Sequence, residues 1–475
     1  MIDLAKLTIE KAHEAMKGGE FSAIDLAQAY LDEIKKKDKE IHAYLEVFSD
    51  VREQAKVADE RFKDNTATLL TGIPFAIKDN ILIKGRIASS ASKILENYHA
   101  TYDATVIAKL KKEGVVFLGR TNMDEFAMGG STENSAYGPT KNPYDPSRVS
   151  GGSSGGSAAS LAMNGALVAL GSDTGGSIRQ PASFCGLVGL KPTYGNVSRY
   201  GVMSMGSSLD QIGPFGKTVT DVEVVFNAIK GKDEKDGTTI SDDTYEIKRI
   251  GEKKPIIGIP RHFLGGDGLS QDVVLNFEQS VEKFKEAGYE VKDVTLPNIS
   301  YSLAVYYVIM PAEVSSNLSR FDGVKYGLHK EGQNAIDDYF ETRGAGFGKE
   351  ARRRILLGTY VLSSGYYDAY YNRANALRRV ITQDFQQAFE KVDIILTPTT
   401  PTPAFKIGEK TSDPVAMYLE DIFTVTANLT GMPAMSIPSG FGDVEGKKLP
   451  LGIQMTARHG DEKTLFEVGK EFLGE

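Results

Sequence analysis

The sequence predicts an α/β fold in which a central sheet is flanked by helices on both faces. Short apolar runs of strand length alternate with stretches of helical periodicity, a pattern typical of sheets covered by helices. The 475 residues exceed a typical domain length but can form one large α/β domain. Apolar residues make up 41% of the chain and charged residues 25%, which is ordinary for a globular protein with a large core.

The N-terminal region, residues 1–65, has a helical pattern. Ser22, followed three residues later by Asp25, predicts the start of a helix. Leu26, Tyr30 and Ile34 then continue at helical spacing. Five apolar runs predict strands at 73–77, 115–118, 167–170, 256–259 and 394–396, and 104–113 reads as a helix between two of them.

Four further regions complete the organisation of this one domain. Residues 66–230 hold the first predicted strands and the Gly/Ser-rich motifs described below. Residues 230–243 are polar and contain glycines, which predicts a surface loop. Residues from about 260 to 350 are rich in helix formers and aromatics and predict a helical insertion or cap, and 351–475 return to the core.

Composition excludes several classes of protein. The net charge of −8 argues against non-specific nucleic-acid binding by the surface as a whole. A single cysteine, Cys185, rules out a disulfide within the chain and a cysteine zinc site, and the six histidines lack metal-ligand spacing. The N-terminus has no signal-peptide pattern, and no apolar run is long enough to span a bilayer. We therefore expect a cytoplasmic protein with no metal site and no membrane association.

Two clusters of glycine and serine carry the candidate chemistry. In residues 150–157, small side chains let the backbone approach a substrate closely, and Ser153 and Ser154 are both candidates. In residues 171–177, Ser177 follows two glycines at a predicted strand end, a suitable place for a nucleophile. The backbone N–H groups of Thr174, Gly175, Gly176 and Ser177 are candidate oxyanion donors.

A serine nucleophile needs a base, and Lys78 is the candidate. It ends an apolar predicted strand, so burial would remove its hydration and lower its pKa until the neutral amine can accept a proton. An alternative remains open, because Gly152–Gly156 also fits the G-x-S-x-G pattern centred on Ser154. That reading requires a histidine such as His262, His329 or His459. A P-loop is disfavoured because no Gly-Lys-Ser/Thr follows the glycines, and Cys185 is expected to be a packing residue.

Lys78, the run 151–157 and the run 173–179 with Pro181 together resemble the amidase signature family in type, order and spacing. The resemblance implies a mixed sheet flanked by helices. It implies that Ser177 is the nucleophile and that Ser153, usually preceded by a cis peptide, relays the proton to Lys78. Within the family the chain is most similar to the A subunits of glutamyl-tRNA(Gln)/aspartyl-tRNA(Asn) amidotransferases, through residues 72–74, 78–80, 198–201, 207–214, 320–323, 353–359, 364–371 and 417–422.

This closer resemblance implies hydrolysis of glutamine to supply ammonia. Arg354 and Asp421 match the positions that bind the α-carboxylate and the α-ammonium of glutamine, and Tyr306 matches a residue of the pocket wall. The resemblance also implies a heterotrimer with B and C subunits. The B subunit would use ATP and Mg²⁺ on the aminoacyl-tRNA, and this chain itself would hold no cofactor.

Two departures and two alternatives accompany this prediction. Residues 310–314 differ from the Ser-Ser-Glu-Ala run usual there, which bears on the wall near Tyr306, and the C-terminus is slightly shorter than usual. A stand-alone amidase with another substrate is one alternative, but a neutral amide would not need the Arg354 and Asp421 charges. A non-catalytic assembly subunit is the other, and the intact lysine and serines argue against it.

Overall fold

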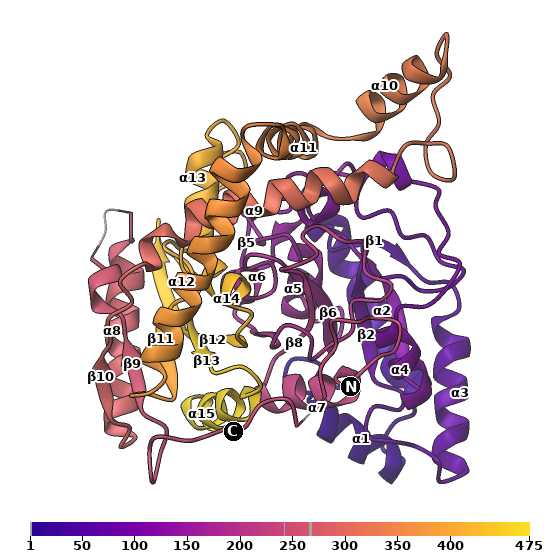
Figure 1. Cartoon of the computed structure of the whole chain (residues 1–475). Helices are drawn as coiled ribbons and strands as arrows, with labels where there is room; N and C mark the ends of the chain where they lie inside the picture. The colour runs from indigo at the N-terminus through magenta and orange to yellow at the C-terminus, as the bar shows by residue number, and fades with distance from the viewer. Residues whose placement is uncertain (1, 242, 266–267) are drawn as a thin grey trace.

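An eleven-stranded sheet flanked by helices runs through the part of the chain that the computed structural model describes, residues 2–241, 243–265 and 268–475 (Figure 1). The strand order across this sheet is β1-β3-β2-β6-β8-β7-β12-β13-β11-β9-β10, and β4 and β5 form a separate two-stranded sheet. None of the helices in the described residues combines the length and the apolarity needed to cross a bilayer.

The strands are β1 Tyr44–Val47, β2 Pro74–Lys78, β3 Val116–Thr121, β4 Lys141–Asn142, β5 Asp145–Val149, β6 Val168–Asp173, β7 Val188–Lys191, β8 Gln211–Gly216, β9 Ile257–Ile259, β10 Val291–Asp293, β11 Ile394–Pro398, β12 Ala434–Val444 and β13 Lys447–Ala457. The α-helices are α1 Ile9–Gly18, α2 Ala23–Ile41, α3 Val51–Lys63, α4 Thr105–Glu113, α5 Gly155–Ala162, α6 Arg179–Phe184, α7 Val219–Ile229, α8 Gln271–Glu286, α9 Ser302–Asn317, α10 Ala335–Gly346, α11 Lys349–Leu362, α12 Arg373–Ala388, α13 Pro414–Tyr418, α14 Val425–Thr430 and α15 Glu462–Leu473.

The sheet is mixed, and its parallel part places the site. Strand β2 pairs in parallel with β3 on one side and with β6 on the other. Beyond β6 the pairing is antiparallel as far as β11, which then pairs in parallel with β9. Because β2 and β6 are parallel neighbours, their last residues, Lys78 and Asp173, leave the sheet at the same edge.

The elements predicted from hydrophobic periodicity are present. The five apolar runs form β2, β3, β6, β9 and β11, and residues 105–113 form α4. Helix α2 begins with a capping box, because the Ser22 side chain accepts the Asp25 N–H and the Asp25 side chain accepts the Ser22 N–H. The predicted loop at 230–243 has no helix or strand in its described residues; Asp242 lies outside them.

Other elements differ from the prediction. Helix α5 begins at Gly155, inside the Gly/Ser-rich run 150–157, so its first turn is made of small residues. The predicted helical insertion at 260–350 is mostly helical but also supplies β10, which extends the sheet beside β9. The β12–β13 hairpin was not predicted, because glycines, two prolines and polar residues interrupt its apolar pattern.

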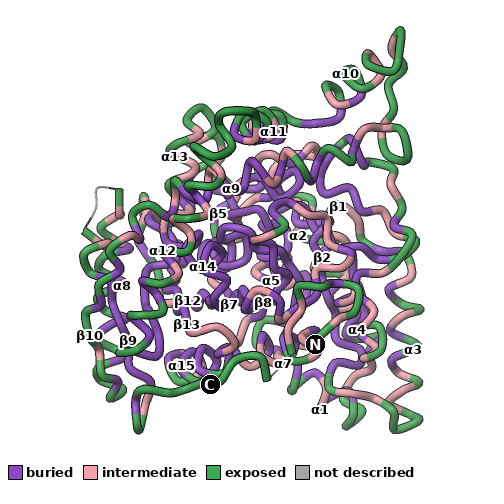
Figure 2. The backbone as a smooth tube through the Cα atoms, in the orientation of Figure 1, coloured by how far each residue is buried: buried purple, intermediate pink, exposed green. Residues whose placement is uncertain are grey.

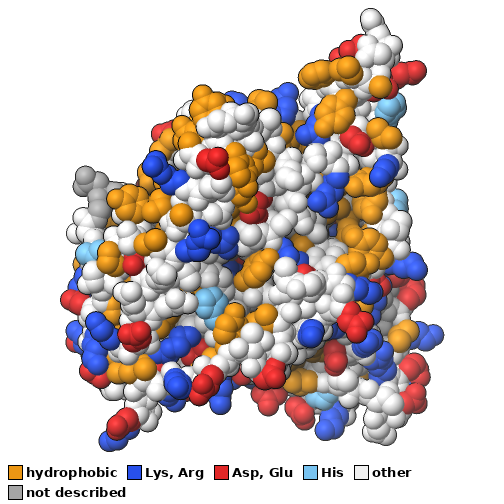
Figure 3. Space-filling model, in the orientation of Figure 1, with side chains coloured by type: hydrophobic (Ala, Val, Ile, Leu, Met, Phe, Trp, Pro, Cys, Tyr) orange, Lys and Arg blue, Asp and Glu red, His pale blue; other side chains and the backbone are white. Residues whose placement is uncertain are grey.

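Two apolar clusters contain the elements that carry the site. The larger one surrounds the sheet and contains the buried strands β2 and β6. The second joins α9, α12 and α14 to the loop after β3 and includes Phe126, Tyr306, Met310 and Phe347. Figure 2 shows the resulting buried interior and an exposed segment around α10 that projects from the body. Figure 3 shows acidic and basic side chains interspersed over the same face, consistent with a modest net charge.

Helices α9 and α11 approach each other closely at one glycine. A Cβ atom at Gly358 would lie 1.8 Å from the carbonyl oxygen of Pro311 and 2.8 Å from the Cβ of Ser315. A glycine is therefore required where these two helices cross.

We predict that Gly358→Ala lowers stability by about 1–3 kcal/mol because the added methyl group pushes α11 away from α9. An ordinary glycine-to-alanine change inside a helix would instead stabilise by about 1 kcal/mol. Gly344→Ala in α10 is the matched control, because no atom lies within 4 Å of the position that its Cβ would take. Thermal unfolding of both variants checks this, and an unchanged midpoint for Gly358→Ala would contradict it.

Candidate active site

Lys78 ends strand β2 in a cage of hydroxyl groups. Its Nζ lies 2.8 Å from the Oγ of Ser153, 2.7 Å from the Oγ of Ser154 and 3.0 Å from the Oγ of Ser172. Ser153 follows a cis peptide bond with Gly152 in the loop before α5. The structure therefore brings together Lys78 and Ser153, two of the three predicted catalytic residues.

The Lys78 amine is fully buried. Burial lowers its pKa to about 7, although the negative charges of Asp124, Asp173 and Asp210 act in the opposite direction. A lysine with this pKa is largely neutral slightly above pH 7 and can accept a proton from a neighbouring hydroxyl.

Ser177, the predicted nucleophile, lies in the loop between β6 and α6, and 8% of its surface is exposed. The backbone N–H of Ser154 donates to the Ser177 carbonyl oxygen at 3.2 Å. This bond joins the two serine-bearing loops directly, so the Ser177 backbone is held beside the Ser153–Lys78 pair.

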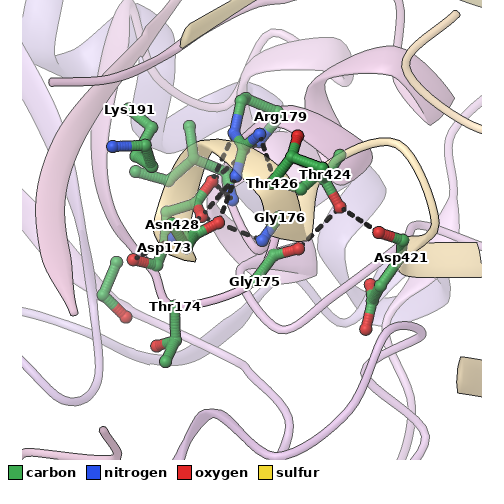
Figure 4. A network of polar contacts seen from close by, with 12 residues as sticks. Asp173, Thr174, Gly175, Gly176, Arg179, Lys191, Asp421, Thr424, Thr426 and Asn428 are labelled. Carbon is green, nitrogen blue, oxygen red and sulfur yellow. Dashed lines mark hydrogen bonds and ion pairs between the residues drawn. The ribbon is translucent and has the colours of Figure 1, made fainter. Parts of the chain in front are cut away.

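A buried ion pair shapes the Ser177 loop (Figure 4). The Asp173 carboxylate accepts the N–H groups of Gly176 and Ile178, and Arg179 Nη2 lies 2.9 Å from Asp173 Oδ1. Burial alone would raise the pKa of Asp173, but Arg179, the Asn428 hydrogen bond and the charge of Lys191 together outweigh it, and the pKa falls to about 2. The carboxylate is thus ionised and fixed, and the loop folds around it.

The same network ties the loop to the C-terminal part of the chain. Arg179 donates to the Thr424 carbonyl oxygen, to Asn428 Oδ1 and to Gln454 Oε1, at 2.8, 2.6 and 2.5 Å. The Thr424 hydroxyl donates to the Gly175 carbonyl oxygen at 2.6 Å. Residues 245 to 275 positions apart therefore hold one loop.

The two glycines before Ser177 are required by packing. A Cβ at Gly175 would lie 2.6 Å from the Tyr306 hydroxyl oxygen, and one at Gly176 would lie 2.3 Å from Thr424 Oγ1. Of the four predicted oxyanion donors, Gly176 is corrected, because its N–H already donates to Asp173 Oδ1 at 2.9 Å. The oxyanion roles of Thr174, Gly175 and the Ser177 N–H stay predictions.

The predicted recognition residues Arg354 and Asp421 both lie beside Tyr307, one member of a stacked aromatic pair. Tyr307 and Tyr418 stack with ring centroids 3.9 Å apart. The Arg354 guanidinium carbon lies 5.7 and 5.5 Å from these two rings, and the Tyr307 hydroxyl donates to Asp421 Oδ2 at 2.8 Å. A buried cation and a half-buried anion thus both lie beside Tyr307.

Arg354 and Asp421 each have a further constraint. Arg354 Nε donates to Glu350 Oε1 at 2.8 Å, and Nη1 lies 3.6 Å from Met310 Sδ. Burial raises the pKa of Asp421 to about 7, although the Tyr307 hydrogen bond and the charge of Arg354 lower it. A cationic group bound beside Asp421 would favour its ionised form.

Tyr306 is buried against Gly175, so it borders the nucleophile loop, whereas its neighbour Tyr307 contacts Asp421. The departure at residues 310–314 has a structural role: Met310 contacts Arg354, and Glu313 accepts hydrogen bonds from the N–H and Oγ of Ser208.

The histidine-dependent alternative has no support in these contacts. The hydrogen bonds of Ser154 go to Lys78, to the Ser172 carbonyl and, through its N–H, to Ser177. His262 and His459 bond to the carbonyl oxygens of Leu296 and Thr430 instead. Cys185 is buried with its Sγ 3.4 Å from the Ser150 carbonyl, and burial raises the pKa of its thiol, which suits a packing residue.

Sequence reasoning missed several residues of the site. Asp173 and Arg179 lie at the two ends of the run 173–179, but no role was predicted for either residue. Their separation by six positions around Gly-Gly-Ser was the available signal. Ser172, Tyr307 and Tyr418 had no local signal, because each matters through a residue far away in sequence. Glu350 lies four positions before Arg354, and this helical spacing of opposite charges was the available signal.

Comparisons with known proteins agree with this geometry. The amidase family profile matches residues 25–466. The A subunit of a glutamyl-tRNA(Gln) amidotransferase from Thermoanaerobacter pseudethanolicus is 50% identical over 478 residues, covering 99% of this chain and 96% of the relative. The crystal structure of the corresponding A subunit from Thermotoga maritima is 42% identical, with a TM-score of 0.79 over 98% of this chain and 94% of that one.

A native peptide amidase from Stenotrophomonas maltophilia has the same fold at 27% identity, with a TM-score of 0.81 over 99% of this chain and 97% of that one. The matched profile, the relatives that align over nearly the whole chain and the Lys78–Ser153 geometry together place this chain in the amidase signature family.

Proposed function

We propose that this chain is the glutaminase subunit of a tRNA-dependent amidotransferase. It would hydrolyse glutamine and supply ammonia to convert Glu-tRNA(Gln) to Gln-tRNA(Gln), Asp-tRNA(Asn) to Asn-tRNA(Asn), or both. The observation that carries this proposal is the pair of opposite charges beside Tyr307, the buried Arg354 and the half-buried Asp421. The names of the relatives that match the whole chain support it.

Free glutamine carries a carboxylate and an ammonium beyond its reacting amide, and this determines what a pocket must supply. Arg354 offers a cation in a planar fork that matches a carboxylate, and Asp421 offers an anion for the ammonium. Burying such charges is unfavourable unless a ligand or a partner compensates them. The Thr424 hydroxyl lies within hydrogen-bond distance of the backbone carbonyl oxygens of Asp421 and Gly175, so the Asp421 backbone is tied to the nucleophile loop (Figure 4).

The proposed reaction begins with attack of Ser177 Oγ on the side-chain amide carbon of glutamine. The Ser177 proton passes to Ser153 Oγ, which passes its own proton to the neutral Lys78 amine. Backbone N–H groups of the Ser177 loop stabilise the oxyanion. The proton returns through Ser153 to the leaving nitrogen, ammonia departs, and water then releases glutamate from the acyl-enzyme.

The proposal includes partners. A B subunit would use ATP and Mg²⁺ to activate the aminoacyl-tRNA and receive the ammonia, and a C subunit would complete a heterotrimer in the cytoplasm. This chain contributes the amidase site, with no cofactor of its own. Its place in a larger complex is supported by the relatives, which are named as A subunits.

A stand-alone amidase of the same family is the second candidate, favoured by the fold shared with a peptide amidase. One experiment separates the two: ammonia release from glutamine is measured for the lone chain and then with co-expressed B and C subunits and charged tRNA. Release from glutamine, stimulated by the partners, is expected. No release from glutamine under either condition would contradict the proposal.

We predict that Arg354→Ala lowers kcat/KM for glutamine about 100-fold, equivalent to about 2.7 kcal/mol, because a buried charge partner of the carboxylate is lost. Butyramide, which is glutamine without its charged groups, should be hydrolysed equally by the variant and the wild type. Arg353→Ala is the matched control, because Arg353 also bonds to Glu350 but is 37% exposed at its side chain. Equal losses for both substrates would argue against a carboxylate-binding role.

We predict that log kcat/KM for glutamine falls with a slope approaching two as the pH drops below 7. Lys78 accepts a proton only when neutral and Asp421 binds an ammonium only when ionised, and both have a pKa of about 7. Butyramide, or Asp421→Asn with glutamine, should give a slope approaching one. A slope of one for the wild-type enzyme with glutamine would show that Asp421 does not take part in binding glutamine.

We predict that Ser177→Ala abolishes covalent labelling by a fluorophosphonate, whereas Ser154→Ala still reacts. Loss of the Ser154 hydrogen bond to Lys78 should slow labelling only about tenfold, the equivalent of one hydrogen bond. Intact-protein mass spectrometry checks both variants. Labelling of Ser177→Ala would identify a different nucleophile, and an unlabelled wild type would favour a non-catalytic role in assembly.

A further inference from the structure

Residues 122–125, directly after strand β3, contact both the catalytic loop and the helix that carries Arg354. On the catalytic side, the Asp124 N–H donates to the Ser153 carbonyl oxygen at 3.1 Å. The Asp124 carboxylate accepts N–H groups from Thr132 and Asn134, and a Cβ at Gly152 would lie 2.1 Å from its Oδ2. Asp124 therefore packs directly against the Gly152–Ser153 peptide and bonds to it.

The next residue, Glu125, contacts the other side. Its Oε2 accepts the backbone N–H of Gly348 at 2.8 Å, and its Oε1 accepts the Ser92 hydroxyl at 2.5 Å. Gly348 is the N-cap of α11, and a Cβ there would lie 2.5 Å from Glu125 Oε2. Glycine at 348 thus leaves room for the carboxylate at the start of the helix.

A buried carboxylate at this junction is unfavourable unless hydrogen bonds or nearby positive charge compensate it. Glu125 is only 2% exposed, and burial raises the pKa of its carboxyl to about 7. The N-terminus of α11 carries partial positive charge from its unpaired N–H groups, which favours an anion at this position. The packing of Phe126 against Phe347, with ring centroids 5.7 Å apart, already fills the apolar part of the same junction.

Helix α11 transmits this contact to the recognition site. Arg354 stands six positions after Gly348, and Glu350, in the first turn, accepts the Arg354 Nε. At the other end of the helix, Gly358 is pressed against Pro311 of α9. A shift of the N-terminal end of α11 would therefore move Arg354 relative to Ser153 and Lys78.

We propose that Glu125 is a positioning residue, which ties the start of α11 to the loop behind Ser153 and so fixes the distance between Arg354 and the Lys78–Ser153–Ser177 group. This inference rests on the proposed glutaminase function, because it concerns how the charged end of glutamine is presented to the nucleophile. It implies that Glu125 affects the KM for glutamine, while hydrolysis of a neutral amide does not depend on it.

The test compares Glu125→Ala with Glu125→Gln in the full chain, using glutamine and butyramide. Loss of the bond to the buried Gly348 N–H should raise the KM for glutamine about 5- to 100-fold, with kcat within about threefold. In Glu125→Gln the introduced side-chain amide can still accept the Gly348 N–H and donate to Ser92. This variant should therefore restore the KM for glutamine to within about threefold of wild type. Hydrolysis of butyramide should change less than twofold in both variants.

Asp221→Ala is the matched control. Asp221 is likewise a buried carboxylate, and it accepts the N–H of Ile9 at the start of α1, at 2.8 Å, away from the site. Its loss should lower the thermal midpoint without raising the KM. If Glu125→Ala does not fold, Glu125→Asp is measured, because its shorter side chain cannot reach Gly348, and a KM increase of at least fivefold is expected.

Each result decides between positioning and other roles. An unchanged KM for glutamine in Glu125→Ala, or in Glu125→Asp where that variant is needed, would overturn the inference and leave the glutaminase proposal intact. Equal losses for glutamine and butyramide would also overturn it, because they would indicate damage to the catalytic group. Absence of glutaminase activity in the wild type, alone and with partners, would instead overturn the proposed function.

Discussion

The buried ion pair between Asp173 and Arg179 is the constraint on which the rest of the site depends. Its carboxylate holds the N–H groups of the Ser177 loop, and its guanidinium reaches Thr424, Asn428 and Gln454. A buried pair of this kind adds little net stability compared with apolar residues, but removing one member is costly. Its contribution is therefore geometric: it gives a glycine-rich loop, which would otherwise be free to adopt many conformations, one shape.

The chemistry of Lys78 also depends on the burial of charge, in this case of a single amine. Three acidic groups near the site favour the protonated amine, yet complete burial outweighs them and brings the pKa to about 7. The hydroxyls of Ser153, Ser154 and Ser172 satisfy the amine in place of water. A lysine can thus act as a base here without a histidine, because the surrounding fold excludes solvent.

The recognition side is built separately and joined to the catalytic edge by a few contacts. Arg354 lies on a helix of the second apolar cluster, whereas Lys78 and Ser177 lie at the edge of the sheet. Three links connect them: Thr424 bridges Asp421 and Gly175, Tyr306 packs on Gly175, and Glu125 bonds to Gly348. This division allows one catalytic group to serve amidases with different substrates, since the helical layer can change while the sheet edge is kept.

The sequence by itself determined the α/β class, the strands of buried apolar residues and the triad candidates Lys78, Ser153 and Ser177. These features are local, because hydrophobic period, capping residues and glycine-rich motifs are written in adjacent positions. Only the tertiary structure decided that the Ser154 hydroxyl accepts a hydrogen bond from Lys78 and that the Gly176 N–H donates to Asp173. It also decided that Tyr307, rather than Tyr306, donates a hydrogen bond to Asp421. It also placed β10 and the β12–β13 hairpin in the sheet. The physical reason is that hydrogen bonds and helix contacts join residues as far as 275 positions apart, and no local pattern encodes which partner a buried polar group will meet.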